Sequence, residues 1–224
     1  MQGKGSFGFA IYAGLGYNFF VNTVQRGRFL LDTRETKMKP DKQESILIIF
    51  LTFMTGCIAG WIYEMGFYRI DAGHFIKRGQ GLGPWLPIYG FGALAITVLF
   101  YNRKHLPAIV FLGSAIAAAI IEFLTGWTLF HFFDGLRLWD YNTEIWNWGN
   151  IGGYICLRSV LVFGFAGLFC IYIVLPEIEA FAHGIRKNSH TPVVFLLGMI
   201  AVTDLVIGYI IKPILLWTLQ GRIL

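Results

Sequence analysis

The chain has 224 residues, of which 56% are hydrophobic and only 14% are charged, and its formal net charge is +5. About a quarter of the residues of a soluble domain are charged, so this composition excludes a soluble globular protein and predicts a multi-pass protein of the cell membrane. The basic residues lie in short loops beside apolar segments, where they orient helices and contact lipid headgroups; membrane lipids are therefore expected as partners, and nucleic acid is not.

The chain opens with an N-terminal extension, residues 1–44, and we expect a single transmembrane domain over residues 45–224. Residues 7–24 are apolar but are interrupted by glycine and asparagine, which is typical of a weak membrane or interfacial segment. Met38 opens the stretch MKPDKQES, which is typical of a start just before a first membrane helix. Two interpretations stay open: residues 1–37 carry a sixth, weak segment, or they precede the true start of the protein.

Five apolar segments then follow at the length that a bilayer requires, about 20 residues for a helix. They lack the alternation of polar and apolar residues that is typical of a barrel strand, so we expect an all-α bundle of transmembrane helices. The predicted helices cover residues 45–68, 85–101, 106–133, 153–175 and 192–219.

The loop between the first two predicted helices, GQGLGPWLPIYGFG, combines glycine and proline with large apolar residues. Its glycines allow sharp turns or close approach, and its prolines suit the start of a helix. Non-helical backbone at membrane depth is tolerated only where it is buried in protein or lines a cavity. We therefore expect a loop that dips back over a polar cluster, or alternatively a tight lid with aromatic anchors. Its candidate residues are Gly79, Gly81, Gly83, Pro84, Pro87 and Tyr89.

Ionisable residues of three predicted helices converge toward one half of the bilayer. Glu64 lies near the end of the first helix, Glu122 lies about 24 Å along the third, and Arg158 lies in the second turn of the fourth. Because successive helices cross in opposite directions, these positions share one leaflet with the loops beside them. The expected substrate-binding cluster contains Glu64, Arg78, Glu122, Asp140, Asn147 and Arg158.

A carboxylate at the bilayer centre costs about 2.5–3.5 kcal/mol on insertion scales, so it usually faces the bundle and has a partner. One interpretation is a buried ion-pair clasp made by Glu64, Glu122 and Arg158, which holds three helices together. The other is a site for a substrate, an ion or a lipid headgroup.

Two further acidic residues have open interpretations. Asp140 is expected to pair with Arg78, Arg137 or Arg158, or to bind substrate. Asp204, near the middle of the fifth predicted helix, is either a transport-type carboxylate or a hydrogen-bonding group between helices. The sequence has no metal-ligand spacing and no GxxxxGK[ST] phosphate-binding loop, so no metal or cofactor is expected, and the chain is not expected to hydrolyse ATP itself.

Four motifs, together with the pattern Asn147–Gly149–Ile151, carry a resemblance to a known family: GWIYE at residues 60–64, RGQGLGPWLPIYGFG at 78–92, EFLTG at 122–126 and LWDY at 138–141. Together they resemble small bacterial membrane proteins labelled ABC-transporter permeases (CmpB, or type IV). The last two motifs are also similar to a family of small vertebrate multi-pass proteins. The bacterial resemblance implies a permease-like subunit that needs a separate ATPase chain and, with only five or six helices, a homo-oligomer.

The leading functional prediction is a permease-like or transport-associated subunit with a one-sided polar cavity under the Gly/Pro loop. The first alternative is a membrane-embedded enzyme or binding protein for lipid or a lipid-linked substrate, in which Glu64 or Glu122 acts as the base. The sequence offers no obvious nucleophile for such an enzyme. The second alternative is a structural scaffold whose polar cluster only specifies helix packing.

Overall fold

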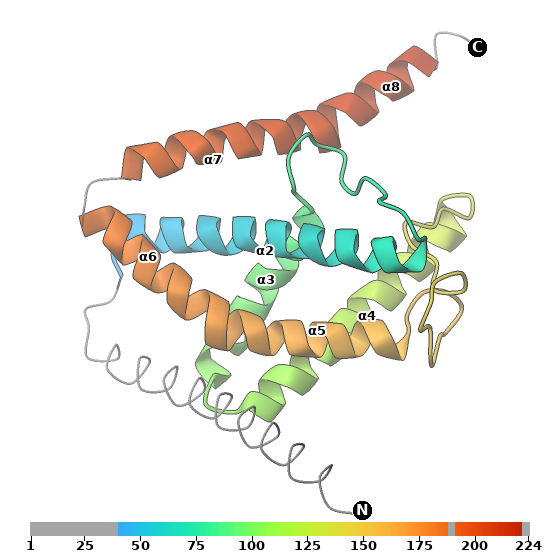
Figure 1. Ribbon diagram of the computed structural model, residues 1–224, viewed down its shortest axis with the longest axis horizontal. Helices are drawn as coiled ribbons and strands as arrows, with labels where there is room; N and C mark the ends of the chain where they lie inside the picture. Colours follow the sequence, from blue (N-terminus) through green and yellow to red (C-terminus); the bar gives the residue numbers. More distant parts are fainter. Residues whose placement is uncertain (1–39, 188–190, 221–224) are drawn as a thin grey trace, which may run out of the picture. The chain divides into compact units, whose positions relative to one another are not determined.

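The computed structural model describes residues 40–187 and 191–220, and its helices belong to one unit, Lys42–Leu224 (Figure 1). The described residues contain no strand beyond an isolated bridge between Ile151 and Ile155, which confirms the all-α prediction for this part of the chain. The predicted weak segment at residues 7–24 lies outside the described residues. The helices are, in order, α2 (Lys42–Asp71), α3 (Pro87–Phe100), α4 (Pro107–Phe132), α5 (Leu157–Phe169), α6 (Leu175–Lys187), α7 (Thr191–Val206) and α8 (Lys212–Gln220).

Among the described residues, four helices are long and apolar enough to cross a membrane: Lys42–Asp71, Pro107–Phe132, Leu157–Ile185 and Pro192–Leu215. The third combines α5 and α6, which a π-helical turn joins at Cys170–Val174. The fourth combines α7 with the start of α8, likewise through a π-helical turn. Four of the five predicted transmembrane helices are therefore present.

The second predicted transmembrane helix is wrong in length. α3 has 14 residues, about 21 Å at 1.5 Å per residue, whereas the hydrocarbon core is about 30 Å thick. The backbone N–H of Leu86 donates to the carbonyl oxygen of Cys57 at 3.2 Å, and Cys57 lies about 21 Å back along α2 from Asp71. The loop of residues 72–86 thus returns along α2 before α3 begins, so α3 is a half-helix that starts midway along α2.

Close packing between helices depends on glycines at the contacts. A Cβ atom at Gly60 of α2 would overlap the ring of Tyr89 in α3, and one at Gly164 of α5 would lie 2.7 Å from the ring of Phe111 in α4. Lipid chains are as apolar as leucine, so helices in a membrane associate through such close van der Waals contact rather than through the hydrophobic effect.

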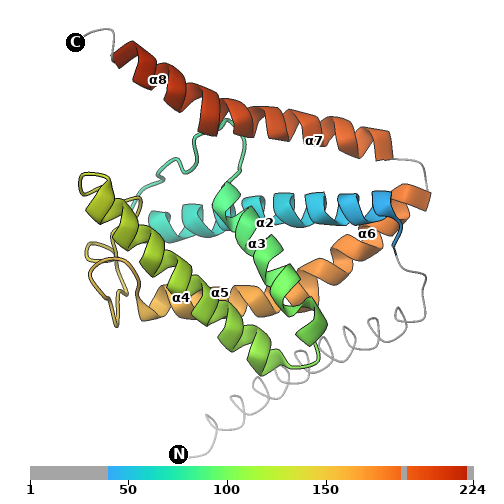
Figure 2. The same cartoon turned by 180° about the vertical axis from the view of Figure 1, so that it is seen from behind.

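The apolar core lies where α3, α4 and the π-helical turn after α5 meet. Its buried members are Phe100, Val110, Ile171 and Leu175. Figure 2 shows α3 crossing α2 and ending next to the start of α4. This core is built without charged side chains, and it leaves the C-terminal half of α2, the end of α4 and the start of α5 to carry the polar residues.

Candidate functional site

The first part of a polar network joins α2 to the re-entrant loop, residues 72–86. Glu64 accepts hydrogen bonds from Arg78 Nε at 2.5 Å and from the Tyr89 hydroxyl at 3.0 Å. The Arg78 guanidinium also lies 4.3 Å from the centre of the Tyr68 ring. Burial lowers the pKa of Arg78, but the hydrogen bond to Glu64 and its charge outweigh this effect and raise the pKa overall. This ion pair attaches the middle of the loop to α2.

The second part is a buried ion pair between a loop and a helix. Glu144, in the loop of residues 133–156, accepts hydrogen bonds from the Tyr68 hydroxyl at 2.9 Å and from Arg158 Nη2 at 2.5 Å. The side chains of Arg158 and Glu144 are only 10% and 7% exposed. The Arg158 guanidinium lies 4.0 Å from the centre of the Phe67 ring, while its Nε and Nη1 are buried without a hydrogen-bond partner. Two of the guanidinium nitrogens of Arg158 are therefore left to bind another group.

The third part holds Glu122 of α4 through hydroxyl groups. The Tyr141 hydroxyl donates to Oε1 at 2.7 Å, and Ser159 Oγ donates to Oε2 at 2.9 Å. Burial raises the pKa of Tyr141, and the neighbouring Glu122 carboxylate raises it further, so this hydroxyl keeps its proton and can donate. The Arg158 guanidinium lies 5.4 Å from the centre of the Tyr141 ring, which connects Glu122 to the ion pair.

These contacts form one polar network that runs from the re-entrant loop to α4. Within the described residues it contains three carboxylates, Glu64, Glu122 and Glu144, and two guanidinium groups, Arg78 and Arg158. Glu122 has no cationic group within ion-pair distance in this part of the chain, so it is the one carboxylate of the network that lies outside an ion pair. Ionisable groups at membrane depth are costly, and they commonly mark substrate or ion pathways.

The network brings together four of the six predicted site residues, but not in the predicted pairing. The ion-pair clasp of Glu64, Glu122 and Arg158 is absent from the described contacts, because Glu64 pairs with Arg78 and Arg158 pairs with Glu144. Helix positions could predict a shared depth for these groups, but not which carboxylate reaches which guanidinium.

The other two predicted site residues, Asp140 and Asn147, stabilise the loop of residues 133–156. Asp140 pairs with Arg137 at 3.4 Å, one of its three predicted partners, and accepts hydrogen bonds from the backbone and side-chain nitrogens of Asn142 at 3.0 and 2.7 Å. Asn147 Nδ2 donates to the carbonyl oxygen of Tyr141 at 2.9 Å. Both residues therefore act on the network indirectly, by shaping the loop that carries its members.

Four members of the network were not among the predicted site residues: Glu144, Tyr141, Tyr68 and Ser159. Tyr141 ends the LWDY motif, and Glu144 follows it closely in the same loop. Their proximity to this motif was the signal that could have identified them as site residues. The direction in which this irregular loop turns each acidic side chain depends on its folded backbone, where Gly149 and Gly153 have positive φ. Such conformations are not read from periodicity.

Asp204 of α7 holds the Gly/Pro part of the re-entrant loop. Its carboxylate accepts hydrogen bonds from the backbone N–H groups of Leu82 at 3.0 Å and Gly83 at 2.9 Å, and from Trp85 Nε1 at 2.8 Å. A Cβ atom at Gly81 would lie 2.6 Å from this carboxylate, so glycine permits the close approach. Of the two interpretations of Asp204, the hydrogen-bonding one fits, although its partner is a loop rather than another helix.

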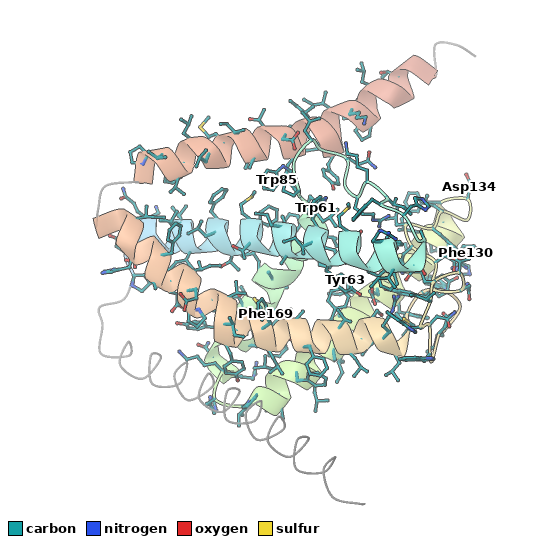
Figure 3. The ribbon with its side chains drawn as sticks, viewed as in Figure 1. Trp61, Tyr63, Trp85, Phe130, Asp134 and Phe169 are labelled. Atoms are coloured by element: carbon teal, nitrogen blue, oxygen red, sulfur yellow. The ribbon has the colours of Figure 1, made fainter. Side chains whose placement is uncertain are left out.

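A groove of about 520 Å³ lies between α2 and the re-entrant loop. Figure 3 shows Trp61 and Trp85 on the side of α2 that faces α7, and Tyr63 on the side that faces α5. Of the network, only Arg78 lines the groove, so this groove is not the predicted polar cavity containing Glu122 and Arg158. Its lining residues are Trp61, Met65, Phe75, Lys77, Arg78, Leu82, Gly83 and Pro84.

In the part of the chain that the structure describes, no group of three or more His, Cys, Asp or Glu side chains is arranged to hold a metal ion. Cys57, Cys156 and Cys170 are free and buried. The chemistry available to the network is therefore that of carboxylates, guanidinium groups and hydroxyls, which bind and orient charged or polar groups.

Comparison with known proteins gives one family. Residues 51–209 match the family described as "Putative ABC-transporter type IV". This segment covers more than half of the chain and contains the whole polar network, together with Asp204. Searches of curated proteins and of solved structures find no match.

Proposed function

The chain belongs to the ABC-transporter type IV family, and we propose that this membrane protein is the permease-like subunit of a transport system whose energy comes from a separate ATPase chain. The family and the membrane-spanning helices support a transport-associated membrane subunit. The sequence has no phosphate-binding loop of the GxxxxGK[ST] type, so ATP hydrolysis is assigned to a partner. Because one copy contributes few helices, a homo-oligomer is part of the proposal.

The observation that carries this proposal is the polar network within otherwise apolar helices. Its ion pair between Glu144 and Arg158 is almost fully buried, and burying such a pair is costly unless its geometry and hydrogen bonds are good. Two donors of Arg158 are nevertheless left without partners. In a side chain that served packing alone, the buried donors would have hydrogen-bond partners. The arrangement therefore favours a site that receives a polar or charged group.

The proposed mechanism uses the re-entrant loop as the movable wall of this site. The loop is attached to α2 through Arg78 and Glu64, and to α7 through Asp204. A relative movement of α7 and α2 would pull the loop through these two attachments. The loop would then move away from α2 and expose the part of the network at Glu64. Glu122, the carboxylate that lies outside an ion pair, is then the group that receives a cationic or hydrogen-bond-donating part of the substrate.

The test compares cells that lack the gene with cells complemented at native expression by the wild-type chain or by Glu122→Gln. The substitution keeps the size of the side chain and one acceptor oxygen, but it removes the charge and replaces the second acceptor with an amide donor. We expect a nucleotide-binding chain to co-purify with both forms, and ATP-dependent movement of a solute into or out of membrane vesicles to fall at least tenfold in E122Q. The solute is identified by comparing metabolites of deleted and complemented cells.

Glu177→Gln is the matched control, because Glu177 is an exposed carboxylate in α6 and lies outside the network. Transport at the wild-type rate in E122Q, together with a lower thermal stability, would mean that the network only specifies helix packing. The absence of any ATP-hydrolysing partner from the wild-type complex would refute the assignment as an ABC-type subunit. Altered lipid species without altered solute movement would favour a membrane enzyme instead.

A further inference from the structure

The groove between α2 and the re-entrant loop has a charged end and an apolar end. Lys77 and Arg78 supply the charge, and Trp61, Met65 and Leu82 supply much of the apolar wall. Arg78 lies next to Glu64, and Trp61 lies about one helical turn nearer the middle of α2. The groove therefore follows α2 from its polar half toward its centre.

The cationic end has hydrogen-bond donors that the described residues do not use. Arg78 donates through Nε to Glu64, and the structure describes no hydrogen bond from either of its Nη atoms. Lys77 is exposed and forms no ion pair within 4.0 Å in the described part of the chain. A guanidinium with two free terminal nitrogens beside an ammonium group suits a phosphate, which a guanidinium binds with two parallel hydrogen bonds.

The apolar end exposes large side chains that the protein itself does not cover. Leu82 is 93% exposed and Phe75 is 71% exposed, although both line the groove. Side chains of this size are normally left uncovered where they meet a lipid or another apolar partner. The indole ring of Trp61, which lines the groove, is suited to the boundary between acyl chains and headgroups.

We propose that this groove binds one anionic phospholipid, with the phosphate held by Lys77 and Arg78 and an acyl chain lying along Trp61, Met65 and Leu82. Glu64 balances the charge of Arg78, so Lys77 supplies the positive charge that selects an anionic headgroup over a zwitterionic one. The apolar wall requires an acyl chain, so a soluble phosphate compound lacks half of the contacts. The bound lipid would also connect the re-entrant loop to the surrounding membrane, because the loop forms one wall of the groove.

The experiment measures lipid retention by the purified full chain in detergent, using native mass spectrometry. Phosphatidylglycerol and phosphatidylcholine with identical acyl chains are compared on the wild type, Lys77→Gln and Met65→Trp. We expect the wild type to bind phosphatidylglycerol at least tenfold more tightly. K77Q should weaken that binding about fivefold, the factor expected for one lysine at an anionic lipid surface, without changing the binding of phosphatidylcholine. M65W should weaken both lipids by filling the groove.

Lys104→Gln is the matched control, since it removes one positive charge from a short loop away from the groove, and it should bind phosphatidylglycerol as the wild type does. Equal binding of the two lipids, or equal binding by K77Q and K104Q, would overturn the proposal. If glycerol 3-phosphate displaced the lipid at similar concentration, the acyl chain would contribute nothing to binding, and the proposal would be overturned. No ATP and no partner chain enter these measurements, so lipid binding and the proposed transport function can fail separately.

Discussion

The two long loops within the described residues differ in how far their own groups hold them. The loop of residues 133–156 is fixed largely by its own groups: Arg137 donates to the carbonyl oxygen of Gly152 at 3.0 Å, and Trp139 Nε1 donates to that of Tyr154 at 2.9 Å. The re-entrant loop depends on distant residues instead. Asp204 binds its backbone, and the Tyr209 hydroxyl donates to the carbonyl oxygen of Trp85 at 3.0 Å.

This difference separates a rigid part of the network from a part that can be released. A loop closed by local contacts keeps its shape when a neighbouring helix moves, so it can deliver Tyr141 and Glu144 at fixed positions. A loop held by another helix loses its attachments when that helix shifts. Regions with few local contacts open at low free-energy cost, and moving elements are drawn from them. The re-entrant loop is therefore the element that we expect to open first.

The largest effect is expected from Glu144→Gln, which breaks the link between the rigid loop and the helices. Glu144 accepts hydrogen bonds from both Tyr68 and Arg158, and removing its charge leaves the buried Arg158 without an anionic partner. Loss of one member of a buried pair typically costs about 3–5 kcal/mol. Thermal unfolding in detergent measures the change, with Glu177→Gln as the exposed control. Equal stability of E144Q and E177Q would show that the rigid loop does not depend on this ion pair.

A smaller and local effect is expected from Asp204→Ala, which removes the distant attachment of the re-entrant loop. The backbone N–H groups of Leu82 and Gly83 lose their acceptor, and a typical hydrogen bond contributes about 0.5–1.5 kcal/mol to stability. Hydrogen exchange followed by mass spectrometry should therefore become faster at residues 79–86 and stay unchanged at residues 140–153.

The neighbouring substitution Thr203→Ala is the control for Asp204→Ala, because the exposed Thr203 hydroxyl donates only within its own helix, to Met199. Exchange should keep its wild-type rate at residues 79–86 in T203A. If exchange increases equally in both loops of D204A, the two loops are not independently held.

The smallest effect is expected from Asp140→Asn, within the rigid loop. Asp140 is partly exposed, its ion pair with Arg137 is long at 3.4 Å, and asparagine keeps an oxygen that can accept the hydrogen bonds of Asn142. The change in stability should be under about 0.5 kcal/mol, as for other weak surface pairs. Thermal unfolding and exchange at residues 140–153 test this. A loss comparable to that of E144Q would mean that Asp140 is a member of the buried network after all.

The sequence could predict the elements that depend on local composition. Apolar segments long enough to cross a bilayer identified four of the membrane helices, and the alternating direction of those helices placed Glu64, Glu122 and Arg158 in one region. Motif resemblance predicted the family, which the match over residues 51–209 confirms. These features are local because hydropathy and helix rise are properties of the segment itself.

The sequence could not predict how far the second segment is helical. Trp85 and Leu86 are as apolar as the helix that follows them, so hydropathy does not distinguish the returning loop from the half-helix. The boundary is set by the hydrogen bond from Leu86 to Cys57 and by the carboxylate of Asp204, two partners that lie far away in the chain.

Composition alone thus determined that this chain is a membrane-spanning helical protein, and the alternating direction of its helices predicted that Glu64, Glu122 and Arg158 share one region. Only the tertiary structure decided which charges meet: Arg78 with Glu64, and Arg158 with a loop residue, Glu144, leaving Glu122 to hydroxyl groups. The reason is physical. The cost of burying a charge depends on its depth in the membrane, which can be predicted from a single helix. The ion pairs and hydrogen bonds that offset this cost depend on distances of a few ångströms, which only the packed helices and the folded loop can set.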